Sequence, residues 1–213
     1  MRLVLASNNS AKLAELHALF APLGFELVTQ GSLGVEEAEE PHHTFIENAL
    51  AKARHAAHRT SGPAIADDSG LCVDALGGAP GVTSAHFAEL PAVQDGDLPG
   101  REERRRSQDT ANNRLLLQRL RGVPDRRARF VSTLVALRRA DDPEPLVAVG
   151  RWHGEIMQAA SGDHGFGYDP LLYIPALGMS AAQLPRETKN AHSHRGLAAL
   201  QMQALMREAW HLG

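Results

Sequence analysis

Two adjacent carboxylates, Asp67 and Asp68, are the residues of this chain best suited to chemistry. They follow the apolar run 63–66 and precede Ser69 and Gly70. Ionised neighbours repel each other, and an apolar approach disfavours both charges further, so a cation must compensate. Mg²⁺ prefers such oxygen ligands, and Gly70 would let the backbone turn sharply beside them. The alternative is a strand ending in an Asp-rich turn whose carboxylates cap backbone N–H groups.

A polar segment near the start of the chain has the composition of a phosphate site. It comprises Ser7, Asn8, Asn9, Ser10, Ala11 and Lys12. Between a strand and a helix, unpaired N–H groups, the positive helix end, small polar side chains and a lysine favour a phosphate. The segment lacks the glycine-rich P-loop pattern, so simple helix capping is the alternative.

Four glutamates precede Pro41 and could supply a further metal ligand. They are Glu36, Glu37, Glu39 and Glu40. One of them could fold back toward the Asp67-Asp68 strand. A solvated loop is the alternative, and nothing in the local sequence ranks the four.

The segment 165–170 combines flexible backbone with two aromatic rings and a carboxylate. Phe166 and Tyr168 alternate with glycines before Asp169 and a proline. A planar ring could dock there, whereas packing of the two aromatic side chains in the core is the alternative.

The last expected helix opens with Ser193, His194, Arg195 and Gly196. Two potential cations stand there at the end of the helix where the macrodipole disfavours positive charge. Such local conflicts are enriched at functional sites, although an exposed helix end would make this one nearly cost-free.

The elements around these residues form an α/β pattern. Residues 3–6 predict a strand and 25–28 a second strand. Between them, after the turn at 7–10, the spacing of Leu13, Leu16, Leu19 and Phe20 predicts a helix that Pro22 and Gly24 end. A capping box at Thr44 begins a helix through about Arg59, which places Lys52 where it could face the carboxylates.

The second half of the chain predicts a loop, a helix and a strand pair. Residues 88–108 lack an apolar period and predict a mobile loop, followed by a helix over 109–121. Residues 129–137 and 146–150 predict an antiparallel strand pair that 152–157 extend, and a closing helix includes Leu197 and Leu205.

The composition indicates a globular protein without bulk affinity for nucleic acid. The 213 residues are 43% hydrophobic and 22% charged, and a net charge of −3 gives no general attraction to a polyanion. Cys72 is the single cysteine, so no intrachain disulfide can form. The N-terminal apolar stretch is too short for a signal peptide and no long apolar segment follows, so we expect a cytoplasmic protein without membrane contact.

Six motifs, in order along nearly the whole chain, closely resemble those of the Ham1/RdgB family of inosine/xanthosine triphosphate pyrophosphatases. Together they are much more specific than any one of them. The motifs are SNNSAK at 7–12, TFIENA at 44–49, DDSGL at 67–71, GGAPG at 77–81, FGYDP at 166–170 and SHRG at 193–196.

The resemblance implies a fold and an activity. The fold is an elongated α/β architecture, a single domain over residues 1–213 made of two lobes on a long mixed sheet, with the nucleotide in the cleft between them. The activity is Mg²⁺-dependent hydrolysis of ITP, dITP or XTP to the monophosphate and pyrophosphate, usually by a homodimer.

The resemblance also implies roles for individual residues. Ser7 to Lys12 correspond to the phosphate loop, Lys52 to a supporting lysine, and Glu40 and Asp68, with Asp67 adjacent, to the metal-binding acids. Asp68 is also the position of the general base. Substrate contacts are implied for Ser69, Phe166, Gly167, Tyr168, Asp169, Lys189, His194 and Arg195.

Some positions depart from the family pattern, and two other functions stay open. His86 and Gln183 differ from the usual residues, and the loop at 88–108 is longer. These departures bear on loop contacts and dimer details more than on the reaction. The alternatives are a Maf-like nucleotide pyrophosphatase with another base preference, and a nucleotide sensor without turnover.

Overall fold

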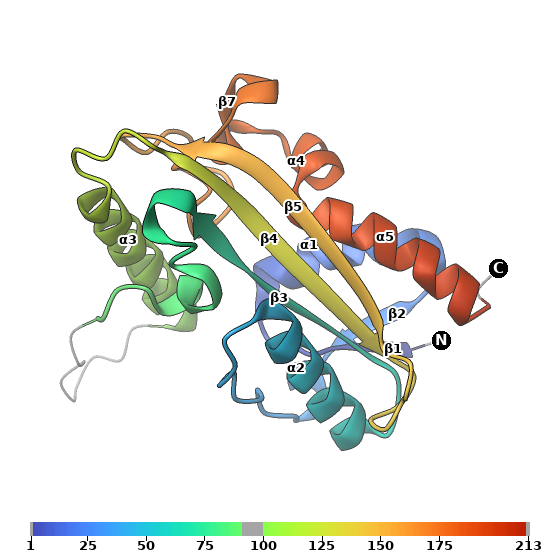
Figure 1. Ribbon diagram of the computed structural model, residues 1–213. Coiled ribbons are helices and arrows are strands. Elements are labelled where there is room, and N and C mark those ends of the chain that lie inside the picture. Colours follow the sequence, from blue (N-terminus) through green and yellow to red (C-terminus); the bar gives the residue numbers. More distant parts are fainter. Residues whose placement is uncertain (1, 91–99, 212–213) are drawn as a thin grey trace. The chain divides into compact units, whose positions relative to one another are not determined.

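The computed structural model describes residues 2–90 and 100–211, which form an α/β fold on one seven-stranded mixed sheet (Figure 1). The strand order is β2-β1-β3-β4-β5-β6-β7. β1 pairs in parallel with β2 and β3, whereas β6 pairs antiparallel with β5 and β7. The predicted mixed α/β sheet is confirmed. Within the described residues, no helix is long and apolar enough to cross a membrane.

The strands are β1 (Arg2–Leu5), β2 (Glu26–Thr29), β3 (Ala64–Val73), β4 (Arg127–Leu137), β5 (Leu146–Ile156), β6 (Leu172–Ile174) and β7 (Met179–Ser180). The α-helices are α1 (Ser10–Phe20), α2 (Phe45–Thr60), α3 (Arg101–Arg119), α4 (Arg186–His192) and α5 (His194–Ala209). Short 3₁₀ segments connect several of them, including Gly81–His86.

The chain divides into two compact units. Unit 1 comprises Met1–Ser69, Val131–Trp152 and Glu187–Gly213, and unit 2 comprises Gly70–Phe130 and His153–Arg186. The strands β3, β4 and β5 each contribute residues to both units. The single domain of two lobes expected from the sequence stays a prediction.

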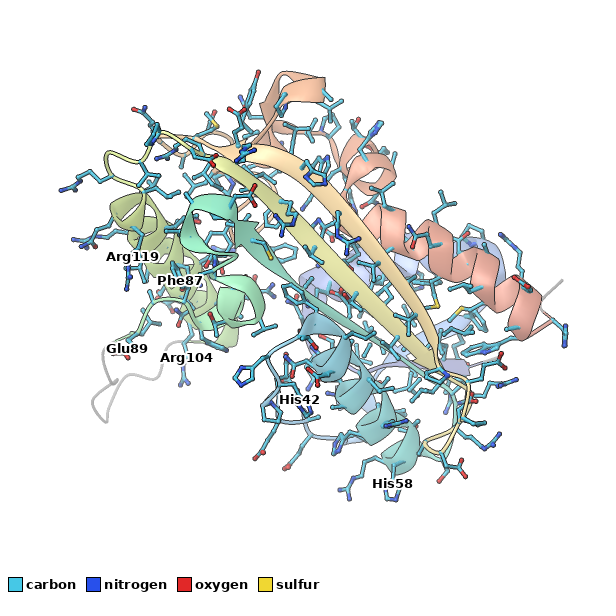
Figure 2. The ribbon with its side chains drawn as sticks, in the orientation of Figure 1. His42, His58, Phe87, Glu89, Arg104 and Arg119 are labelled. Carbon is cyan, nitrogen blue, oxygen red and sulfur yellow. The ribbon has the colours of Figure 1, made fainter. Side chains whose placement is uncertain are left out.

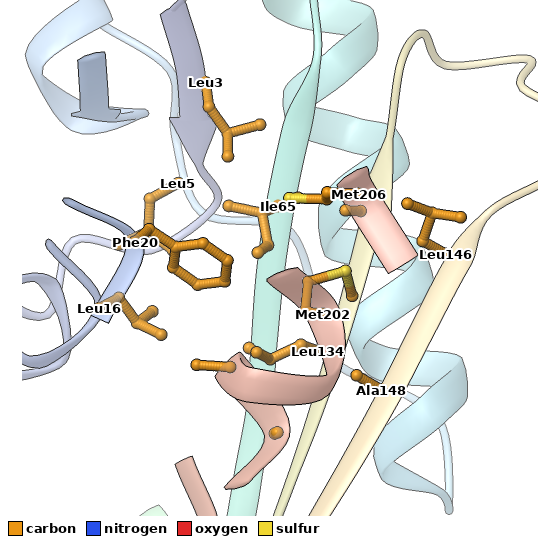
Figure 3. Packing of buried hydrophobic residues seen from close by; sticks show 13 residues of the cluster. Leu3, Leu5, Leu16, Phe20, Ile65, Leu134, Leu146, Ala148, Met202 and Met206 are labelled. Atoms are coloured by element: carbon orange, nitrogen blue, oxygen red, sulfur yellow. The ribbon is translucent and has the colours of Figure 1, made fainter. Parts of the chain in front are cut away.

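The sheet of unit 1 buries alternate residues against different helices. Leu3, Leu5 and Ile65 belong to a cluster with residues of α1 and α5 (Figure 3). Val4 and Ala64 belong to a second cluster with the small side chains of α2. This alternation follows from the two-residue period of a strand, and it means that helices cover both faces of this part of the sheet.

The helix α2 begins as the sequence predicts. Thr44 Oγ1 accepts a hydrogen bond from the Glu47 N–H, which satisfies one of the unpaired donors of the first turn. Buried alanines such as Ala49 and Ala53 form its inner face, and small side chains let a helix lie close to a sheet. Lys52 is thereby carried to the strand that holds Asp68.

Gly70 does not turn the chain after the two aspartates, so that expectation is wrong. β3 continues through it to Val73, and Gly70 has no positive φ. A Cβ at Gly70 would lie 2.4 Å from both the Gly81 carbonyl oxygen and Ser84 Oγ. Glycine is needed there for close packing inside unit 2, and Asp67 and Asp68 lie within a strand rather than at its end.

The helix α3 begins at Arg101, so the loop predicted over 88–108 is wrong for residues 101–108; residues 91–99 lie outside the described part of the chain. Glu102 and Glu103 occupy the first turn, where the macrodipole favours negative charge. Exposed arginines stand at both ends, among them Arg104 and Arg119 (Figure 2). An exposed helix needs little apolar periodicity, which explains why the sequence pattern missed its first turns.

Candidate functional site

Asp67 is the centre of a buried charge cluster in unit 1. Its Oδ1 accepts a 2.7 Å hydrogen bond from Ser132 Oγ, and its Oδ2 lies 3.0 Å from Lys12 Nζ and 3.2 Å from Arg195 Nε. Ser69 Oγ donates to the same Oδ2 at 3.0 Å. Burial alone would raise the pKa of Asp67, but the charges of Lys12 and Arg195 outweigh it and hold that pKa far below its usual value.

Asp68 belongs to a separate group, because adjacent residues in a strand point to opposite faces. Its Oδ1 lies 2.8 Å from Lys52 Nζ, which also lies 3.1 Å from Glu40 Oε2. Burial, opposed by Lys52 and reinforced by the Glu40 charge, raises the pKa of Asp68 to about 6. The carboxyl group can therefore exchange a proton near neutral pH.

Asp68 and Glu40 fit a hard divalent cation. The Lys52 ammonium group already bridges their oxygens, and Asp68 Oδ2 is buried with no hydrogen-bond partner among the described residues. The described residues contain no group of three or more His, Cys, Asp or Glu side chains placed to hold a metal ion. A metal here would take these two acids and other oxygens from substrate or water. A ligand role for Asp67 stays a prediction.

The phosphate segment occupies the turn from β1 into α1. Asn9 Oδ1 accepts from the Lys12 N–H at 3.0 Å and so caps α1, and Ser7 Oγ accepts from the Asn9 N–H at 3.2 Å. The Asn8 N–H donates to Glu37 Oε1 at 3.2 Å. Ser10 and Ala11 are the first residues of α1, whose N–H groups have no partner within a helix. The capping alternative is therefore fulfilled, and an anion-binding role of this segment stays a prediction.

Glu15 is a site residue that the sequence analysis missed. Its Oε1 lies 3.1 Å from Lys189 Nζ, and its Oε2 accepts a hydrogen bond from Arg195. Burial would raise the pKa of Glu15, but the Arg195 and Lys189 charges outweigh it and lower that pKa. Its position three residues after Lys12, on the same face of α1, is the only signal that could have found it.

The start of α5 resolves the charge conflict seen in the sequence. Burial and the Arg195 charge lower the pKa of His194 well below its usual value, so this histidine is neutral and adds no charge. Its ring stacks on Trp152, with centroids 6.5 Å apart. Gly150 allows the backbone of α5 to lie close to β5, because a Cβ at this position would lie 1.9 Å from the His194 carbonyl oxygen. The Arg195 charge is balanced by Asp67 and Glu15.

The aromatic loop lies in unit 2. Asp169 Oδ2 accepts from the Phe166 N–H at 2.9 Å, and Tyr168 Oη donates to the Ser84 carbonyl oxygen at 2.9 Å. Tyr168 is buried, as the core-packing alternative expects, whereas Phe166 is half-buried. Gln183, one of the departures from the family pattern, caps a 3₁₀ turn through the Ser180 N–H.

Residues on one face of α3 hold this loop in place. The sequence did not predict this contact. Asp109 Oδ2 accepts from the Gly167 N–H at 2.9 Å, and Asn113 Nδ2 donates to the Gly167 carbonyl oxygen at 2.9 Å. The Arg105 guanidinium lies over the Phe166 ring, 4.9 Å from its centroid. The signal was present as a four-residue spacing, but the first of these residues fell in the predicted loop.

The structure therefore groups the expected site residues in two sets. Unit 1 brings together Lys12, Glu40, Lys52, Asp67, Asp68, Ser69, Lys189 and Arg195, with His194 and the phosphate segment on the adjoining turns. Unit 2 holds Phe166, Gly167, Tyr168 and Asp169.

Comparison with known proteins finds relatives over the whole chain. The sequence profile of the Ham1 family matches residues 3–205. A dITP/XTP pyrophosphatase of Leptothrix cholodnii is 70% identical over all of both chains. One of Methylibium petroleiphilum is 68% identical over 99% of each.

Solved structures agree with these sequence matches. A HAM1 protein from Coxiella burnetii superposes with a TM-score of 0.84 at 40% identity, over 98% of this chain and 99% of that one. The Ham1 protein of Staphylococcus aureus gives 0.81 at 35% identity, over 98% and 100%. With a family profile matched over residues 3–205 and relatives up to full length, the chain belongs to the Ham1 family.

Proposed function

We propose that this protein hydrolyses non-canonical purine nucleoside triphosphates, namely ITP, dITP and XTP, to the nucleoside monophosphate and pyrophosphate. The observation that carries the proposal is the buried cluster of unit 1, which gathers lysines and carboxylates beside a helix start suited to phosphate. The names of relatives up to 70% identical support the same reaction.

The residues of unit 1 have different proposed roles in the reaction. Asp68 is the proposed general base, which accepts the proton of the attacking water. Lys12 and Lys52 stabilise the charge that develops on phosphoryl oxygens. Their positions are set by Asp67 and Asp68 before a substrate arrives.

Mg²⁺ is the proposed cofactor, held by Glu40 and Asp68. When bound, it neutralises part of the triphosphate charge. The donor set of two carboxylates, one with an unpartnered buried oxygen, supports a hard oxygen-seeking cation rather than zinc.

Base recognition is proposed for Lys189 and Arg195, and separately for Phe166. Lys189 and Arg195 can donate to the keto oxygen at C6 of hypoxanthine or xanthine, whereas the amino group of adenine would leave these donors unpaired. Phe166 offers a ring on which a base can stack. Guanine shares the keto oxygen, so its rejection depends on the 2-amino group.

A panel of nucleotides tests the reaction and its alternatives. With Mg²⁺, pyrophosphate should be released from ITP, dITP and XTP much faster than from ATP or GTP. Faster release from pyrimidine triphosphates would favour the Maf-like alternative, and ITP bound but unchanged would favour the sensor. Equal rates on all purines would contradict the selectivity.

Asp68→Asn tests the general base. We expect turnover of ITP to fall by roughly 10²–10⁴-fold, because the amide keeps the shape but accepts no proton. The fold should persist because Lys52 still has Glu40 as a partner. Asp141→Asn, which changes an exposed carboxylate, is the matched control. Wild-type turnover in the Asp68 variant would refute the assignment.

A homodimer in the cytoplasm completes the proposal. Free nucleotides are found there, and the family resemblance supports a dimer. Light scattering after size-exclusion chromatography measures the assembly, and a mass of 23.0 kDa would indicate a monomer.

A further inference from the structure

The loop that carries Phe166 is held by one stripe of α3. Arg105, Asp109 and Asn113 are spaced by four residues and so share one face of the helix. Two of them bind the N–H and the carbonyl oxygen of Gly167, and the third covers the neighbouring Phe166 ring. A loop residue with both backbone groups engaged has little freedom, so the position of the ring is fixed by α3.

Three carboxylates belong to the same group as the loop and Arg105. Asp109 and Asp169 accept hydrogen bonds from the loop backbone, and Glu102 adds a further negative charge to this group on α3. The arginines beside Arg105 in sequence are exposed. The Arg105 guanidinium lies over the ring, and its positive charge opposes the charge of these carboxylates.

A guanidinium on one face of an aromatic ring changes what the ring attracts. The faces of a phenylalanine ring carry partial negative charge, which a nearby cation offsets. Phe166 is half-buried, so part of its surface remains accessible for stacking. A base stacked on this ring would lie close to the Arg105 charge, which favours electron-rich or anionic bases.

Xanthine and hypoxanthine, the two expected bases, differ in their charge and in their number of carbonyl groups. Xanthine carries carbonyl groups at C2 and C6 and loses a ring proton near neutral pH, whereas hypoxanthine has one carbonyl and stays neutral. We propose that Arg105, acting through Phe166, sets the preference of this protein for xanthine over hypoxanthine nucleotides. The inference rests on the proposed function and names the selectivity within it. Arg105 is a positioning residue rather than a catalytic one.

The test compares kcat/KM for XTP and ITP at pH 6 and pH 8 in wild type and variants. Arg105→Met keeps a long apolar side chain without the charge, Arg105→Gln puts a neutral polar amide in place of the guanidinium, and Arg105→Lys keeps the charge. Arg106→Gln removes an exposed charge one residue away and is the matched control. Ionisations of the enzyme that affect both substrates cancel in the XTP/ITP ratio.

We expect the wild-type ratio to rise with pH, as more xanthine becomes anionic, and to fall with added salt, which screens the charge. At pH 8 the Met and Gln variants should lower the ratio by about threefold to tenfold and flatten its rise with pH. Arg105→Lys should keep most of the wild-type XTP/ITP ratio, and Arg106→Gln should leave that ratio unchanged. A purely structural role would change both substrates alike and leave the ratio constant.

An unchanged ratio and slope in Arg105→Met and Arg105→Gln would overturn the inference. If these variants do not fold, a wild-type ratio that is flat with pH and salt would also overturn it. A wild-type protein that hydrolyses neither nucleotide would instead contradict the proposed function. In that case calorimetric affinities for xanthosine and inosine monophosphate give the same comparison without turnover.

Discussion

Units 1 and 2 hold their expected ligand-binding residues by different interactions. In unit 1, four cations and four carboxylates are paired among themselves: Lys12, Lys52, Lys189 and Arg195 with Glu15, Glu40, Asp67 and Asp68. In unit 2, the aromatic loop is held mainly through its backbone groups and the Tyr168 hydroxyl.

The two kinds of interaction differ in how much stability is lost when one partner of an ion pair or of a hydrogen bond is removed. A buried charge that loses its partner is strongly destabilised, because its desolvation is no longer compensated. A neutral hydrogen bond contributes less, and loss of one costs about 1 kcal/mol. Unit 1 thus depends on paired charges, whereas unit 2 depends mainly on hydrogen bonds to backbone groups.

Asp67→Asn should give the largest effect on stability. The amide can still accept from Ser132, but Lys12 and Arg195 lose the carboxylate that compensates their burial. We expect the free energy of unfolding at pH 7 to fall by about 3 kcal/mol or more, measured by urea titration. Asp141→Asn, which breaks an exposed ion pair with Arg139, is the control and should cost less than about 1 kcal/mol.

The pH dependence of stability sharpens this prediction. The folded-state pKa of Asp67 is depressed, so its contribution is present above the unfolded pKa of about 4 and is lost as pH falls toward the folded value. Wild type should therefore lose stability below about pH 4 more steeply than Asp67→Asn. Parallel curves, or a variant as stable as wild type at pH 7, would refute the role of Asp67 as the centre of the cluster.

Asn113→Ala should have an intermediate effect, on binding. It removes the donor to the Gly167 carbonyl oxygen and leaves the charges of unit 1 untouched. Loss of about 1 kcal/mol of loop positioning corresponds to about a fivefold higher KM for ITP, with kcat nearly unchanged. Gln118→Ala, an exposed change on the same helix, should leave KM as it is. An equal loss in kcat would mean that α3 also affects the chemical step.

The sequence predicts well whatever depends on local pattern. The strand-turn-helix at Ser7 to Lys12, the Thr44 cap and the start of the last helix near Ser193 were found because each depends on a few neighbouring residues. The identity of the family followed from motifs in order along the chain.

What the sequence could not give depends on tertiary contacts. In the sequence Gly70 suggests a turn, but a glycine is required there because Gly81 and Ser84 approach it closely. Adjacent Asp67 and Asp68 suggest one site, yet strand geometry separates their partners. Glu15 and Ser132 are ordinary in sequence and acquire a role only where Arg195 and Asp67 meet them.

Tyr168→Phe should give the smallest loss of stability. It tests how much one neutral hydrogen bond contributes to unit 2. Burial raises the pKa of Tyr168, so its hydroxyl is a neutral donor, and its acceptor, the Ser84 carbonyl oxygen, also receives a hydrogen bond from Asn112 Nδ2 at 3.2 Å. Because no buried group is left without a partner, the loss should be at the low end of a hydrogen bond, about 0.5–1 kcal/mol in urea unfolding. Tyr173→Phe, the same change at the other tyrosine, is the control. A loss from Tyr168→Phe as large as that from Asp67→Asn would mean that unit 2 depends on a single polar contact as strongly as unit 1 does, and the distinction between the two units would fail.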